Sequence, residues 1–122
     1  MKIAIKGHAF RGKEVIKILE SIGGKNVDGL TGTYESFYYI DDENEICDNY
    51  FKDNFSSTYK LYTLEEFEKE FPFKIGDEVT IIGIPDFPKI ITQMMWDCDE
   101  ILYSFEGLNN TWFGAKALKS LK

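Results

Sequence analysis

The segment QMMWDCDEILYSF (Gln93–Phe105) holds two runs of bulky apolar residues on either side of Asp97-Cys98-Asp99. Bulky apolar and aromatic residues favour β-strands, and a short polar stretch between two such runs favours a tight turn. The segment therefore predicts a β-hairpin, in which Ile90–Trp96 is one strand and Glu100–Phe105 is the returning strand.

The sequence on both sides of this hairpin continues the pattern of short strands. Lys74–Ile82 begins with a Gly-Asp turn and continues as a strand, while residues 83–88 (GIPDFP) are expected to form a loop. Thr111–Phe113 is expected to be a last short strand, and Ala115–Leu121 is expected to pack on the mouth of a barrel. Short strands at this spacing predict a small β-barrel over residues 73–122.

The first part of the chain has a different pattern. Residues 2–6 (KIAIK) alternate polar and apolar side chains, as a half-buried strand does. A helix should follow, because one apolar stripe recurs at helical spacing before Gly23-Gly24, where glycine permits the left-handed conformation that ends helices. The residues of this stripe are Val15, Ile16, Ile18, Leu19 and Ile22.

Further strands and a second helix complete the front part. Ser36–Ile40 and Tyr59–Tyr62 are expected strands, and residues 41–44 are an expected hairpin turn. Thr63 and Glu66 form a capping-box pattern that opens a helix ending before Pro72. The sequence thus predicts an α+β protein with a small β-α-β front lobe, residues 1–72, and a small barrel, residues 73–122.

The barrel segment resembles the SH3-like barrels of Tudor and KOW modules. The residues that carry the resemblance are Lys-x-Gly-Asp-x-Val (Lys74–Val79), the hairpin Gln93–Phe105, and the closing Trp-Phe-x-Ala-x-x-Leu that begins at Trp112. Such barrels bind protein tails, peptides or nucleic acid, or serve as scaffolds, so the resemblance implies a fold and not a function.

The front lobe carries a second resemblance. Its start, IKGHAFRGKEVIKILESIGGKN (Ile5–Asn26), resembles that of small uncharacterised proteins encoded by bacteriophages and prophages of gut bacteria. The order strand, loop, helix and Gly-Gly is also similar to the first β-α unit of a BRCT domain. The phage resemblance implies a host-cell context and no particular chemistry.

Composition restricts the class of protein. Of the 122 residues 43% are apolar, so disorder of the whole chain is not expected, and no apolar run is long enough for a membrane helix or an export signal. We therefore expect a cytoplasmic protein with two free thiols, Cys47 and Cys98. With one histidine and no CxxC pair, neither a metal site nor a cofactor is expected. Residues 1–25 carry a net charge of +4, so the other 97 residues must carry −11 for the total of −7.

One loop has the spacing of a phosphate-binding motif. Residues 7–13 (GHAFRGK) fit G-x-x-x-x-G-K between a strand and a helix, which predicts an anion site built from Gly7, His8, Arg11, Gly12 and Lys13. Glu14 stands where a Ser or Thr should hold magnesium, so nucleotide hydrolysis is not favoured. A tight strand-to-helix turn with solvated basic side chains is favoured over an anion site, and for His8 a structural role is favoured over that of a general base.

Other residues are candidates for binding a partner. Asp41, Asp42 and Glu43 form an acidic tip that could imitate nucleic acid, although a solvated hairpin turn is the favoured explanation. Trp112 could line an aromatic groove, while most aromatic residues of the barrel are expected in its core.

Taken together, these patterns predict a binding protein rather than an enzyme. The favoured partner is a host protein, for example a defence factor that a phage-encoded protein inhibits, and direct binding to nucleic acid or to a membrane is not expected. The competing hypothesis is a module that sequesters a phosphate-bearing small molecule or nucleotide on the Gly7–Lys13 loop.

Overall fold

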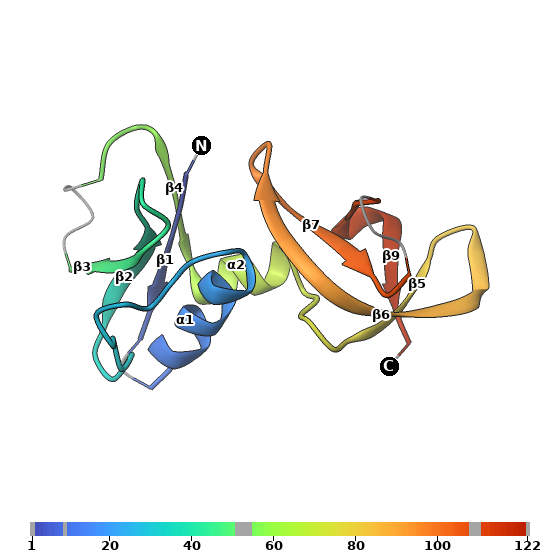
Figure 1. The fold of residues 1–122 in the computed structure, drawn as a ribbon, viewed down its shortest axis with the longest axis horizontal. Coiled ribbons are helices and arrows are strands. Elements are labelled where there is room, and N and C mark those ends of the chain that lie inside the picture. The colour runs from blue at the N-terminus through green and yellow to red at the C-terminus, as the bar shows by residue number, and fades with distance from the viewer. Residues whose placement is uncertain (1, 9, 51–54, 108–110, 122) are drawn as a thin grey trace. The chain divides into compact units, whose positions relative to one another are not determined.

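A computed structural model describes residues 2–8, 10–50, 55–107 and 111–121. The chain divides into two compact units, Met1–Lys69 and Glu70–Lys122. The described residues form two α-helices and nine strands in two separate sheets, so the protein is α+β and mostly β (Figure 1). In the described part of the chain, neither helix is long and apolar enough to cross a membrane.

The first unit is built on a four-stranded sheet with the order β3-β2-β1-β4. The strand β1 lies inside the sheet, antiparallel to β2 and parallel to β4, so the chain must cross over between β1 and β4. The helix α1 belongs to the chain segment between these two strands. The bounds of the strands are Lys2–Gly7 for β1, Ser36–Ile40 for β2, Ile46–Asn49 for β3 and Tyr59–Thr63 for β4.

The helix α1 runs from Gly12 to Ser21, and it buries Val15, Ile16, Ile18 and Leu19 of the predicted apolar stripe. Ile22, the last residue of the predicted stripe, follows the helix and is half-buried. The helix ends in a double hydrogen bond: the Gly24 amide donates to Leu19 O at 2.8 Å, and the Gly23 amide donates to Glu20 O at 3.1 Å. The positive φ of Gly23, 106°, permits this arrangement. The predicted role of the Gly-Gly pair is therefore confirmed.

The helix α2, Leu64–Glu70, begins with the predicted capping box. The Glu66 amide donates to Thr63 Oγ1 at 3.1 Å, and the Thr63 amide donates to Glu66 Oε1 at 2.9 Å. Phe67 of this helix is buried against Tyr62 of β4, with ring centroids 5.8 Å apart.

The two faces of the first sheet have different coverings. Ile3 and Ile5 are buried on the face that α1 covers, with Val15 and Leu19 of the helix. The opposite face carries aromatic rings that pack edge to face with centroids 5.2–5.6 Å apart. These rings belong to Phe37, Tyr39, Phe55 and Tyr59. Apolar side chains therefore cover both faces of the sheet, those of α1 on one face and the aromatic rings on the other.

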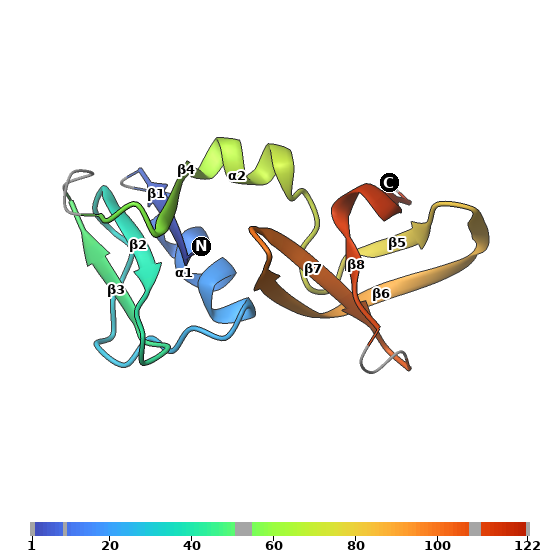
Figure 2. The same cartoon turned by 90° about the horizontal axis from the view of Figure 1, so that it is seen from above.

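The second unit is a five-stranded sheet with the order β8-β7-β6-β5-β9. All its neighbouring strands are antiparallel, and β6 is long enough to pair with β5 near its start and with β7 near its end (Figure 2). The predicted hairpin Gln93–Phe105 is confirmed, and its turn residues Cys98 and Asp99 both have positive φ. The strand bounds are Glu78–Ile81 for β5, Ile84–Asp97 for β6, Glu100–Phe105 for β7, Phe113–Gly114 for β8 and Leu118–Ser120 for β9.

The prediction of a loop at residues 83–88 is wrong. The turn between β5 and β6 consists of Ile82 and Gly83 only, and β6 already begins at Ile84. The register jumps from Ile81↔Ile84 to Val79↔Lys89, so β6 bulges outward over several residues. A bulge accommodates proline because its residues leave the hydrogen-bonded ladder, which explains why a Pro-rich stretch lies within a strand.

The C-terminal residues also differ from the prediction. Trp112 lies outside the last strands, and Ala115–Ala117 form a 3-10 turn, η2, that leads into β9. Leu118 pairs with Ile81 of β5, so this segment completes the sheet edge rather than packing on a barrel mouth. The described strands β8 and β9 are the two edges of the sheet, and no pairing closes it into a barrel within the described residues.

Candidate functional site

The Gly7–Lys13 loop joins β1 to α1, as the phosphate-loop hypothesis requires. Gly7 and Gly12 are buried at the two ends of the loop, while His8 and Lys13 are exposed. Ala9, in the middle of the loop, lies outside the described residues. The Arg11 amide donates to His8 O at 2.8 Å, which makes the loop a tight turn.

The backbone of Gly32 lies directly against the start of α1. A Cβ atom on Gly12 would be 2.3 Å from Gly32 O, and a Cβ atom on Gly32 would be 2.4 Å from Lys13 N. The Lys13 amide is among those that a phosphate would contact at a helix N-terminus. Gly32 therefore covers one approach to this amide, and both glycines are needed for the close contact.

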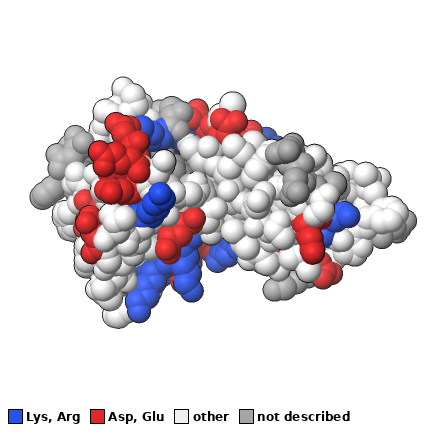
Figure 3. Space-filling view, viewed as in Figure 1, with Lys and Arg blue, Asp and Glu red and all other residues white. Residues whose placement is uncertain are grey.

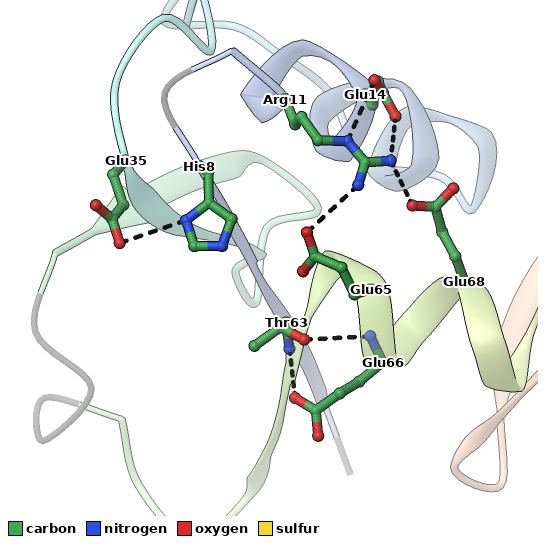
Figure 4. Close-up of polar contacts among 8 residues, drawn as sticks. All are labelled: His8, Arg11, Glu14, Glu35, Thr63, Glu65, Glu66 and Glu68. Atoms are coloured by element: carbon green, nitrogen blue, oxygen red, sulfur yellow. Dashed lines mark hydrogen bonds and ion pairs between the residues drawn. The ribbon is translucent and has the colours of Figure 1, made fainter.

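The Arg11 side chain is surrounded by carboxylates from two helices (Figure 4). Its guanidinium contacts Glu14 at 3.0 Å, Glu68 at 2.5 Å and Glu65 at 3.4 Å. The hydrogen bonds to Glu14 and then Glu68 raise the pKa of Arg11 further above its ordinary value. The positive charge of Arg11 thus connects α1 to α2, and an added anion would have to compete with three carboxylates.

His8 lies beside an acidic residue of the neighbouring loop. Its Nδ1 is 3.7 Å from Glu35 Oε1, and Lys6 Nζ is 3.1 Å from the same oxygen. The contact with Lys6, with a smaller effect of His8, holds the pKa of Glu35 below its ordinary value. Glu35 therefore stays ionised at neutral pH and offsets the charge of Lys6.

The structure thus brings the five predicted anion-site residues together but gives most of them a structural contact. Gly12 packs on Gly32, Arg11 pairs with three glutamates, and His8 lies near Glu35. Lys13 is exposed and has no ion pair with the described residues. Anion binding at this loop stays a prediction, and among its charged side chains Lys13 is the one on which it depends.

Substitution of Gly32 tests the close contact with α1. We expect Gly32→Ala to lower the free energy of unfolding by about 3 kcal/mol or more, because the methyl group adds a backbone clash to the left-handed strain. Gly29 is a matched control, since its φ of 65° nearly equals the 69° of Gly32 and a Cβ atom there meets nothing within 4 Å. Gly29→Ala should cost about 1 kcal/mol. Urea unfolding followed by helical circular dichroism measures both variants, and equal losses would contradict the proposed contact.

The acidic tip between β2 and β3 is held by Asp41. Its Oδ1 accepts the amides of Glu43 and Glu45, both at 2.9 Å, and its Oδ2 lies 3.5 Å from Cys47 Sγ. Asp42 forms an ion pair with Lys2. Of the three candidate partner residues here, Asp41 and Asp42 thus have contacts inside the first unit, and Glu43 has an exposed side chain.

The turn formed by Asp41 makes stability depend on pH. The backbone amide of Glu45 is the largest cause that lowers the pKa of Asp41 from its ordinary 3.8. A lowered folded-state pKa means that the carboxylate stabilises the native state above pH 3.8, and that this contribution is lost as the pH falls through the folded-state value.

We expect the free energy of unfolding to fall below about pH 4 and the fall to be smaller in Asp41→Asn, whose side chain does not titrate. Urea unfolding at several pH values measures both slopes. An unchanged slope in the variant would contradict a role of Asp41 in acid sensitivity, and Glu43→Gln is the control for an exposed carboxylate.

The aromatic residues of the second unit lie mostly in its core. Tyr103 is fully buried beside Phe73, with ring centroids 5.7 Å apart, and burial raises the pKa of its phenol. Trp112 is half-buried, and the neighbouring Phe113 packs against Phe105 with centroids 5.5 Å apart. The role of Trp112 in partner binding stays a prediction.

Several large apolar side chains of the β5–β6 hairpin are exposed, which was not predicted. Ile82 and Phe87 are each 62% exposed, and Ile84 and Ile90 are about half exposed. We call these four residues the hairpin patch: Ile82 lies in the turn, Ile84 and Ile90 pair with β5, and Phe87 lies in the bulge between them. The sequence signal for this exposed surface is the apolar content of residues 82–90, although the Gly and Pro residues within 83–88 favour a loop there.

Comparisons with known proteins do not assign the chain to a family. No family model, no curated protein and no solved structure matches it. Within the part of the chain that the structure describes, no group of three or more His, Cys, Asp or Glu side chains is placed to hold a metal ion.

Proposed function

We propose that this chain is a non-enzymatic binding protein that contacts another protein through the hairpin patch. The exposure of Ile82, Ile84, Phe87 and Ile90 on one hairpin carries the proposal. Each exposed apolar Å² costs about 25 cal/mol relative to burial, so a cluster of large apolar side chains gains free energy when a partner covers it.

Hydrogen bonds on both sides of β5 hold the hairpin next to its turn. Ile82 donates its amide proton to Ala117 O at 2.9 Å, and Ile81 pairs with Leu118 of β9. The strand β5 is thus bonded on both sides directly next to the turn. A patch that is ordered before binding loses less conformational entropy in the complex, which favours its use as a recognition surface.

The topology of the second unit supports an SH3-like barrel as its fold type. Four strands follow one another as neighbours from β5 to β8, and the fifth, β9, returns to pair with β5 after the turn η2. We propose that this unit is a binding module of the SH3-like type, as the segments Lys74–Val79 and Gln93–Phe105 suggest. In this proposal the five-stranded sheet is the scaffold, and the hairpin patch makes the contact.

The resemblance of Ile5–Asn26 to phage and prophage proteins suggests what the partner is. We propose a host protein in the bacterial cytoplasm, such as a defence factor that the chain inhibits by covering its surface. The net charge of −7 fits a soluble inhibitor of this kind. Sequestration of a phosphate-bearing ligand is the weaker proposal, because Arg11 already contacts three carboxylates.

Loss of the hairpin patch should abolish capture of the partner. We expect Ile82→Ser combined with Phe87→Ser to reduce the amount of partner recovered from a bacterial lysate by about tenfold or more, since buried anchors dominate interface energies. Nuclease treatment should not change the recovery. Val27→Ser is the matched control, because Val27 is an apolar residue, 57% exposed, in the first unit. Equal recovery by the double variant and the parent would refute binding through the patch.

A thermal-shift experiment separates the two proposals. We expect that roughly 10 mM phosphate or ATP leaves the melting temperature unchanged, because a ligand stabilises a protein only when it binds the folded state. A rise that disappears in Lys13→Ala would instead support anion binding at the Gly7–Lys13 loop.

A further inference from the structure

The first sheet has its longest edge strand at β4. β4 pairs with β1 on one side and is the last strand in the order β3-β2-β1-β4 (Figure 1). The opposite edge, β3, has four residues and is partly covered, since the Ile46 amide donates to Lys25 O at 2.8 Å. The edges of the second unit, β8 and β9, have two and three residues, whereas β4 has five. Among the described residues, β4 therefore offers the longest edge for pairing with a further strand.

One hydrogen bond shows which backbone groups of β4 point away from the sheet. The Lys2 amide donates to Thr58 O at 2.8 Å, and Lys2 lies opposite Tyr59. In a parallel ladder alternate residues direct both their backbone groups to the neighbouring strand, so this bond fixes the phase of the whole strand. The residues whose backbone groups face outward are Tyr59, Leu61 and Thr63.

Only the middle one of these three outward amides is open. The Tyr59 amide donates to Ser56 O at 3.1 Å, and the Thr63 amide donates to Glu66 Oε1 at 2.9 Å. The outward amide and carbonyl oxygen of Leu61 have no hydrogen bond to another described residue. One donor and one acceptor on a single residue are what one hydrogen-bonded pair of an antiparallel ladder requires.

We propose that β4 pairs antiparallel with β4 of a second copy of this chain, with Leu61 opposite Leu61. Each Leu61 amide then donates to the carbonyl oxygen of the other Leu61, so two-fold symmetry satisfies both open groups at once. The two four-stranded sheets join into one sheet of eight strands. This inference goes beyond the proposed function, because it uses the first unit and not the hairpin patch.

The side chains of β4 suit this register. With Leu61 at the two-fold axis, Lys60 lies opposite Tyr62 of the second copy, and Tyr59 lies opposite Thr63. Neither pair places like charges opposite each other, and a lysine beside an aromatic ring is attracted to it. Tyr59 and Leu61 are half-buried in the single chain, so a second copy would cover apolar surface that is still accessible.

Lys60 does not block the edge. A lysine often protects an edge strand from pairing. Lys60, however, lies opposite Ile3 and shares the face that α1 covers, where its Nζ is 5.4 Å from the centroid of the Tyr62 ring. Figure 3 shows acidic and basic side chains next to one another on the first unit, so the face in view does not carry charge of a single sign.

A second copy fits the open groups better than a long strand from another protein. Such a strand gains affinity from a row of backbone hydrogen bonds along the edge. The amides of Tyr59 and Thr63 already have acceptors, so the row on β4 is limited to the pair at Leu61. A two-fold contact needs no more than this pair, because both of its bonds come from the same residue.

Sedimentation equilibrium of the full chain tests the pairing. Because a short strand contact gives a weak dimer, the measurement extends to roughly 0.5 mM chain. We expect the mass to rise with concentration from 14.1 kDa toward twice that value. Leu61→Lys places two like charges opposite each other, and it should weaken self-association by at least about tenfold, as should Leu61→Glu. An equal mixture of these two variants should associate again, since their charges are then opposite.

The control and the contrary outcomes are specific to the register. Val27→Lys, on an exposed apolar residue of the same unit, should leave self-association unchanged. A parent that stays a monomer, a dimer that tolerates Leu61→Lys, or a mixture that does not associate overturns the proposal. Restored association in the mixture also shows that both variants are folded.

The same variants separate this inference from the proposed function. A monomeric parent whose partner recovery from lysate falls in Leu61→Lys overturns the second copy in favour of a strand of another protein. Self-association that is lost in Ile82→Ser/Phe87→Ser but kept in Leu61→Lys overturns it in favour of contact through the hairpin patch. Dimerisation that depends on Leu61 alone supports the proposal, whether or not the hairpin patch captures a partner.

Discussion

The pairing of β5 with two partners is the constraint on which the second unit depends. β5 has only four residues, yet it bonds to β6 on one side and to β9 on the other, and β9 is reached only after the turn η2. This arrangement fixes the turn at Ile82, because the amide of Ile82 reaches Ala117. The exposed side chain of Ile82 is thereby held on a hydrogen-bonded turn, which lowers the conformational entropy that it loses on binding.

The first unit uses charge and glycine for internal contacts. The phosphate-loop spacing at Gly7–Lys13 has a structural explanation, since Gly12 permits the approach of Gly32 and Arg11 joins α1 to α2. Asp41 in the same unit organises its turn through backbone amides. Gly12, Arg11 and Asp41, whose residue types suggest ligand binding in isolation, therefore stabilise the fold here.

Local signals in the sequence predicted local structure well. The capping box of Thr63 and Glu66, the helix end at Gly23-Gly24 and the hairpin around Cys98 depend on neighbouring residues and were predictable. The early start of β6 and the formation of β9 both depend on pairing with β5, and β9 is far from β5 in the sequence. Composition alone therefore predicted a loop in place of the start of β6 and a packing segment in place of β9. The contact between Gly12 and Gly32 is also tertiary, and no periodic pattern in the sequence predicts it.

Binding through the hairpin patch is the central claim, and the location of the interface tests it most directly. Hydrogen–deuterium exchange of the chain with and without its captured partner gives that location residue by residue. The account predicts that amides of residues 82–90 and 116–119 exchange more slowly in the complex while those of 7–13 are unchanged. Protection confined to the Gly7–Lys13 loop, or to the tip at Asp41–Glu43, would contradict it.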